Sequence, residues 1–102
     1  MKIPQIKVLH MNWGLPLNSK AYKEVGMLMV EILPYIYEVK HADDEGAIVY
    51  VIVGEDQEKE IKELRKRFLY IDVWFEEDED PEEIKKQRLL RWAEKKGVRK
   101  SD

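Results

Sequence analysis

The segment AIVYVIV, residues 47–53, constrains the fold of this 102-residue chain more than any other feature. It is wholly apolar or aromatic, it is rich in β-branched residues, and Gly46 and Gly54 bound it. This composition is typical of a β-strand. Because side chains alternate between the two faces of a sheet, the strand places apolar groups on both faces. A sheet that contains it therefore needs cover on both sides.

The segments around this strand predict a β-α-β-β-α-β order followed by a C-terminal helix. Strands are expected where aromatic and β-branched residues cluster, and helices where apolar residues recur every three to four positions. A short acidic turn joins two of the strands into a hairpin. In chain order the predicted elements are a strand over 3–13, a helix over 20–33, strands over 35–41 and 47–53, a helix over 55–67, a strand over 69–75 and a helix over 81–96.

Proline, glycine and polar residues mark the ends of the predicted helices. Residues 18–19 are Asn-Ser, either of which can cap the first helix, and Pro34 ends that helix. Asp80 is suited to cap the last helix, with Pro81 in its first position. Gly97 stands where a glycine commonly follows the last turn. These signals predict that the chain leaves the first helix at Pro34 and then enters a strand.

This element order favours an α+β fold, the ferredoxin-like split βαβ sandwich with strand order 4-1-3-2 and two helices on one face. The alternative takes residues 20–41 as one helix kinked at Pro34, which leaves three parallel strands in a small α/β doubly wound sheet. A chain of this length is typical of one domain. The predicted organisation is a single domain over 1–102, a first βαβ motif over 3–41, a second over 47–75 and the C-terminal helix over 81–96.

A weak internal duplication supports the ferredoxin-like fold. At an offset of 34 residues Glu38-Val39 falls on Asp72-Val73, and at an offset of 35 Tyr35-Ile36 falls on Tyr70-Ile71. Two βαβ units related by a pseudo-twofold axis produce such a repeat. A chance likeness between two strands that end in acidic residues also produces it.

With the small size and the abundance of Glu and Lys, the paired segments 35–45 and 70–79 resemble the short orphan proteins encoded by filamentous viruses of hyperthermophilic crenarchaea. The resemblance covers the whole chain but has no motif of its own. It implies a viral protein that works in the host cell, and it implies neither a reaction nor a functional residue.

The predicted strands and the first helix hold more apolar residues than one core layer needs, which favours a protein partner. Three arrangements would cover the second face of the sheet: the C-terminal helix with Leu89, Leu90 and Trp92, a partner polypeptide, or an identical subunit. The outer strands also offer unpaired backbone groups beside aromatic side chains, to which an extended peptide can add as a further strand. The leading hypothesis is a non-enzymatic protein-protein interaction module. Its candidate partner-binding residues are Met27, Tyr35, Tyr37, Tyr50, Tyr70 and Trp74.

Nucleic-acid binding through the C-terminal helix is the alternative function. The net charge is −3, but residues 85–102 hold eight Lys or Arg against two acidic residues. RNA-recognition domains of ferredoxin-like fold carry stacking aromatics in strands one and three, and residues 8–13 and 45–50 do not reproduce that pattern. A polypeptide partner is therefore favoured over nucleic acid. The basic residues are Lys85, Lys86, Arg88, Arg91, Lys95, Lys96, Arg99 and Lys100.

No metal, cofactor or catalytic group is expected. The segment 41–44, His-Ala-Asp-Asp, is more typical of a solvated hairpin tip than of a cation site, and the acidic run 76–80 lacks the spacing of a calcium loop. Without cysteine the chain has no thiolate ligand or thiol nucleophile. Its apolar runs are far shorter than the ~20 residues of a membrane span. No signal peptide is evident at the N-terminus, so an intracellular location is expected.

Overall fold

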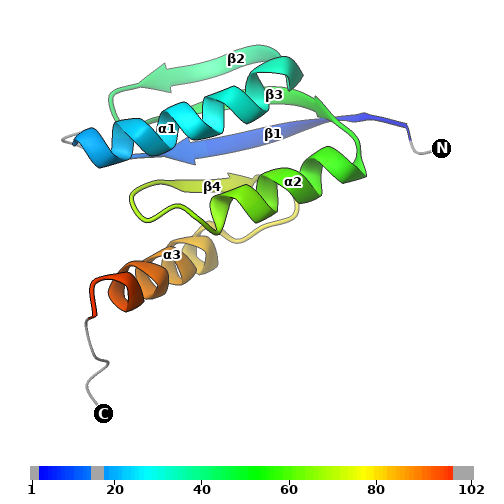
Figure 1. Ribbon diagram of the computed structural model, residues 1–102. Coiled ribbons are helices and arrows are strands. Elements are labelled where there is room, and N and C mark those ends of the chain that lie inside the picture. The colour runs from blue at the N-terminus through cyan, green and yellow to red at the C-terminus, as the bar shows by residue number, and fades with distance from the viewer. Residues whose placement is uncertain (1–2, 15–17, 98–102) are drawn as a thin grey trace.

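A four-stranded antiparallel sheet lies at the centre of the computed structural model, which describes residues 3–14 and 18–97 (Figure 1). The strands lie in the order β2-β3-β1-β4, and every neighbouring pair is antiparallel. This is the predicted order 4-1-3-2 counted from the other edge. The strands are β1 (Gln5–Asn12), β2 (Ile36–Asp43), β3 (Gly46–Val53) and β4 (Asp72–Phe75).

Helices α1 and α2 lie together on one face of this sheet, and α3 lies beside β4 (Figure 1). The helices are α1 (Ser19–Ile32), the short 3-10 helix η1 (Leu33–Tyr35), α2 (Glu55–Arg65) and α3 (Pro81–Lys95). The Asn18 side chain caps α1 by accepting the Ala21 N–H at 2.8 Å, and the Asp80 side chain caps α3 by accepting the Glu82 N–H at 3.0 Å. Polar caps predicted from the sequence therefore start both helices.

The core lies between the sheet and the two helices that cover it. Strands β1, β3 and β4 contribute the buried strand residues of this layer, as β3 does with Val49 and Val51, whereas β2 contributes only the half-buried Ile36. Leu28 and Ile32 of α1 and Ile61 of α2 close the layer from the helix side. The buried residues of the core cluster are Leu9, Met11, Ala21, Leu28, Ile32, Ala47, Val49, Val51, Val53, Ile61, Phe68, Ile71, Val73 and Phe75.

The chain leaves α1 at Pro34 as expected, through the single turn η1, and enters β2 at Ile36. Proline has no N–H to donate to the preceding turn, so it does not support a continued α-helix. The alternative of one kinked helix over 20–41, with three parallel strands, is therefore wrong.

The strand predicted over 69–75 is shorter than expected and begins at Asp72. The backbone N–H groups of Leu69 and Tyr70 both donate to the carboxylate of Glu24 in α1, each at 2.8 Å. Arg88 donates to the Leu69 carbonyl at 3.1 Å. Side chains from two helices thus satisfy backbone groups that a neighbouring strand would otherwise pair, so this segment is a loop.

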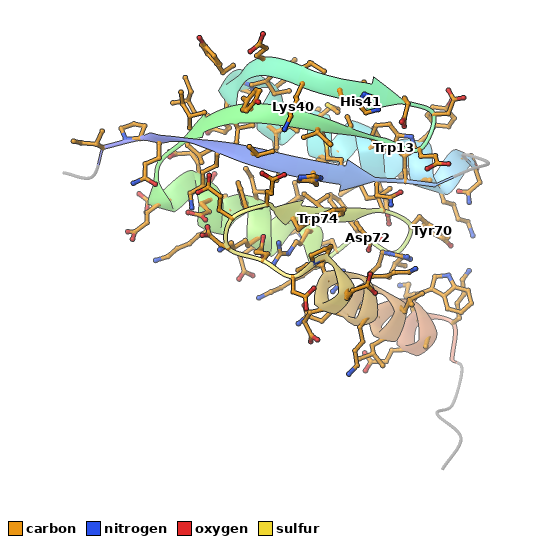
Figure 2. All side chains as sticks on the ribbon, turned by 180° about the vertical axis from the view of Figure 1, so that it is seen from behind. Trp13, Lys40, His41, Tyr70, Asp72 and Trp74 are labelled. Carbon is orange, nitrogen blue, oxygen red and sulfur yellow. The ribbon has the colours of Figure 1, made fainter. Side chains whose placement is uncertain are left out.

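The second face of the sheet carries no helix over the described parts of the chain (Figure 2). The C-terminal helix packs against β4 instead of folding back across this face, and Ile84 is its buried apolar residue. Leu89 and Leu90, expected to cover the sheet, are 47% and 36% exposed. The intramolecular cover proposed from the sequence is therefore wrong. The uncovered side is called the open face below.

Candidate functional site

The outer edge of β4 is closed by side chains. The Glu76 N–H donates to the Val8 carbonyl of β1, so by alternation the backbone groups of Val73 and Phe75 point outward. The Phe75 N–H donates to the Glu79 carboxylate at 2.8 Å. Arg65 donates to the Val73 carbonyl at 3.3 Å. The Phe75 carbonyl accepts the Glu79 N–H at 3.2 Å, so three of the outward backbone groups are bonded within the chain.

An ion pair holds this arrangement together. The Arg65 guanidinium binds both oxygens of the Glu79 carboxylate, and the two side chains are 14% and 10% exposed. Burial favours the neutral acid, but the hydrogen bonds from Arg65 and from the Phe75 N–H outweigh it and hold the pKa of Glu79 below its usual value. Glu79 is thus an ionised bridge between α2 and β4.

The helix α3 reinforces the same edge. Arg88 donates through Nε to the buried carboxylate of Asp72 at 2.6 Å. Arg91 donates to the carbonyls of Phe68 and Arg65 at 3.1–3.4 Å. Burial, with Arg65 and Arg88 nearby, lowers the pKa of the Arg91 guanidinium. The β4 edge is therefore enclosed by ionic and backbone contacts.

The outer edge of β2 has no such cover. Within the described ranges, no side chain is hydrogen bonded to a backbone group of Ile36–Asp43. Apolar side chains flank this edge and are largely exposed: Leu33 is 64%, Tyr37 63% and Val39 56% exposed. We call these three residues together with the outer backbone of β2 the edge surface.

The geometry of α1 places Leu33 on the β2 side. Glu31 helps to line a hollow of about 410 Å³ between α1 and α2, so its side of α1 faces α2. Leu33 comes two residues later, roughly 200° around the helix, and therefore faces away from α2. In a layer where α2 lies on the β4 side of α1, that direction points to the β2 edge (Figure 1).

Two irregularities interrupt the pairing of β2 with β3. The register shifts between Ile36 and Glu38, and again between Val39 and His41. Bulges of this kind bend and twist an edge strand and make indiscriminate pairing with other chains less favourable. The β2 edge is therefore exposed but irregular.

The open face carries a row of aromatic and charged groups (Figure 2). The rings of His10 and Trp74 stack, with centroids 5.0 Å apart and planes 14° from parallel. The His10 Nε2 contacts the Glu76 carboxylate at 2.9 Å, and this hydrogen bond lowers the pKa of Glu76. On the next strands the Lys40 ammonium lies 5.9 Å from the centre of the Tyr50 ring. This face is therefore polar as well as aromatic.

The tip of the β2-β3 hairpin is held by its own polar contacts. His41 contacts Asp43 at 2.9 Å, which lowers the pKa of Asp43, and the Trp13 indole donates to the Asp44 carbonyl at 3.0 Å. Asp43 also accepts the N–H groups of Glu45 and Gly46. In the part of the chain that the structure describes, no three His, Asp or Glu side chains are grouped as metal ligands would be.

The six residues predicted to bind a partner do not share one surface. Tyr37 belongs to the edge surface, and Tyr35 packs against the core just before it. Tyr50 and Trp74 lie on the open face, across β1 from each other. The remaining two lie elsewhere: Met27 on the α2 side of α1, one turn before Glu31, and Tyr70 in the loop before β4.

Two residues of the edge surface were not singled out from the sequence. Leu33 precedes Pro34 and fits the apolar stripe of the first helix, so its exposure is not evident from spacing. Val39 lies in a strand that the predicted order already places at an edge, but the sequence pattern does not show that α1 leaves the helix side of Val39 uncovered. Exposure in both cases depends on the tertiary arrangement.

Fewer basic side chains of the C-terminal helix are free to contact phosphates than its composition indicates. Arg88 and Arg91 are bonded to Asp72 and to backbone carbonyls, as described above. The lysines Lys85 and Lys86 stay exposed on α3. Arg99 and Lys100 lie outside the described residues. The nucleic-acid alternative thus has fewer free cations than predicted.

Comparison with known proteins gives one informative relative. The chain is 43% identical to "Uncharacterized protein 17" of Sulfolobus islandicus filamentous virus (isolate Iceland/Hveragerdi) over 72 residues, which are 71% of this chain and 92% of the relative. The chain belongs to the family of this viral protein. The resemblance to filamentous-virus proteins is therefore confirmed.

No protein-family model matches the chain, and no solved structure matches it. In its described ranges, every helix is too short or too polar to cross a lipid bilayer.

Proposed function

We propose that this viral protein is a non-enzymatic interaction module that binds an extended polypeptide along the β2 edge. The observation that carries the proposal is the contrast between a closed β4 edge and a free β2 edge within one sheet. An outer strand presents a row of backbone donors and acceptors, and another extended backbone is the complementary ligand for such a row.

The edge surface supplies the side-chain contacts that this mode of binding needs. Backbone pairing provides affinity without selectivity, so discrimination depends on contacts to alternate side chains. Leu33 and Val39 are exposed apolar groups, and Tyr37 is an exposed aromatic one. Burying one such side chain contributes about 1.5–3 kcal/mol to binding.

We also infer that the sheet and its two covering helices are a ferredoxin-like sandwich. The element order β1-α1-β2-β3-α2-β4, the antiparallel pairing and the placement of α1 and α2 on one face support this assignment. The internal repeat supports it as well, because Val39 and Val73 both face the helix side in β2 and β4, and both strands are outer strands.

Selection from a displayed library of linear peptides, followed by hydrogen exchange, tests the proposed function. Peptides that bind should protect the backbone amides of β2 from exchange and leave those of β4 unchanged. Tyr37→Ala should weaken their binding about tenfold or more, because it removes an aromatic contact. Leu89→Ala removes an exposed apolar side chain on α3, at the opposite edge, and should have no effect. Peptides that protect α3 or the open face instead would contradict the proposal.

A further inference from the structure

The charges on β2 are arranged symmetrically about one residue. Val39 lies between Glu38 and Lys40, and all three are exposed. Glu38 is opposite Tyr50 in the β2-β3 register, so it points to the open face. Lys40 lies over the ring of the same Tyr50, so it shares that face. Val39 is opposite the buried Val49 and points to the helix side.

This arrangement makes β2 complementary to a second copy of itself. In an antiparallel pair with Val39 opposite Val39 of the other copy, each Glu38 is opposite a Lys40. Shifting the register by two residues places Glu38 opposite Glu38, or Lys40 opposite Lys40. Cross-strand pairs of opposite charge stabilise a sheet, and like charges directly opposite destabilise it. A shift by one residue turns the side chains to the wrong faces. A single register therefore satisfies both charges.

The apolar part of the edge surface fits the same symmetry. A twofold axis perpendicular to the sheet joins two four-stranded sheets into one and keeps both α1 helices on the same side. Val39, 56% exposed in one copy, then meets its own counterpart on the helix side. Leu33, which faces the β2 side of α1, lies on that same side of the joined sheet.

We propose that the strand bound at the β2 edge is β2 of a second copy, paired antiparallel about Val39 with two Glu38–Lys40 contacts. This inference rests on the proposed function, since it names the partner of the same edge. It differs from a dimer that covers the open face, because here the open faces stay uncovered and continuous.

A charge-swap series measured by analytical ultracentrifugation on the full chain tests the inference. The wild-type protein should sediment as a dimer whose dissociation constant rises about tenfold or more in Glu38→Lys and in Lys40→Glu, since each variant places like charges opposite twice. The double variant Glu38→Lys/Lys40→Glu should restore the wild-type constant, because each lysine again meets a glutamate. Lys86→Glu, an equal charge change at an exposed position of α3, should leave the constant unchanged. Circular dichroism should show all four variants folded.

Several results would overturn the inference. They are a monomeric wild type, single variants that dimerise as well as the wild type, and a folded double variant that fails to recover. Peptide binding keeps the two proposals separable. If the wild type is monomeric while selected peptides still protect the β2 amides, the second copy is the wrong partner and the β2 edge stays the binding site. If peptides also fail to protect β2, the proposed function fails with it.

Discussion

The strands β2 and β4 are both outer strands of one sheet, yet their outward backbone groups differ in what they bind. On β4 the Val73 carbonyl accepts from Arg65 and the Phe75 N–H donates to Glu79, so the edge is filled by side chains. On β2 the flanking Tyr37 and Val39 are exposed, and bulges replace the side-chain cover. Two different devices thus protect the edges of one sheet: side chains bond the outward backbone groups of β4, and bulges bend β2 while its outer backbone stays uncovered.

Removing the Glu79 carboxylate should lower the free energy of unfolding more than the other alanine substitutions at the β4 edge. Glu79→Ala leaves the Arg65 charge and the Phe75 N–H without their partner at a nearly buried position. We expect the free energy of unfolding to fall by about 3 kcal/mol, measured by chemical denaturation. Glu77→Ala, at an exposed neighbouring position, should change it by less than about 0.5 kcal/mol. Equal losses in the two variants would show that Glu79 does not close the β4 edge.

Removing Arg88 tests the contribution of α3 to the same edge. Arg88→Ala leaves the Asp72 carboxylate, only 8% exposed, without its cation, and the Leu69 carbonyl loses a donor. The expected loss is about 2 kcal/mol, checked by thermal unfolding. Lys86→Ala on the exposed side of α3 is the matched control. Because α3 closes an edge, deletion of 81–102 should destabilise the fold by more than Arg88→Ala alone. Unchanged melting of the truncated chain would mean that α3 is dispensable.

Features that depend on local sequence patterns were predicted correctly, whereas those that depend on long-range contacts were not. Element order, strand order and helix caps depend on local patterns, such as Asn18 before α1 and Pro34 after it, and these were predicted correctly. The loop over 69–71 was predicted as a strand because its residues favour strands. The deciding contact comes from Glu24, 45 residues away along the chain from Leu69. Periodicity contains no information about such a contact.

The candidate binding residues were predicted less well than the fold, for a physical reason. Aromatic type identifies residues that can bind, whereas exposure decides which of them are accessible. Tyr35 and Tyr37 are two residues apart and equal in type, yet Tyr35 packs on the core and Tyr37 is exposed at the edge. The edge position of β2 follows from the strand order. Its exposure follows from the position of α1, which leaves the side chains of β2 uncovered. Neither is a property of one residue.

Acidification should destabilise the β4 edge, because it protonates the Glu79 carboxylate that bonds Arg65 and the Phe75 N–H. The pKa of Glu79 is held below its usual value of 4.5 in the folded protein. A lowered folded pKa adds stability that is fully present above the unfolded value and is lost as the pH falls through the folded value. Wild-type stability should therefore decline as the pH falls below about 4.5, with proton uptake on unfolding. Glu79→Gln should unfold with a smaller uptake than Glu77→Gln. Identical pH profiles for these two variants would exclude a role for Glu79.

The smallest change in stability should come from a substitution on the free edge. Val39→Lys replaces a side chain that is already 56% exposed, so the free energy of unfolding should change by less than about 0.5 kcal/mol in chemical denaturation. A lysine on an edge strand opposes pairing with a further strand, because a charge must then be buried at the new contact. The same variant should therefore lose edge binding while it keeps its fold.

Val73, which the internal repeat aligns with Val39, provides the matched comparison. It is 1% exposed, so Val73→Lys forces a charge into the core and should prevent stable folding. If Val39→Lys were equally destabilising, β2 would be as enclosed as β4 and the asymmetry of the two edges would disappear. If it unfolds like the wild type and no longer binds selected peptides or a second copy, the free edge contributes to binding and hardly to stability. Val73 and Val39 occupy equivalent positions of the repeated βαβ unit, yet Val73 would then stabilise the core and Val39 would contact the partner.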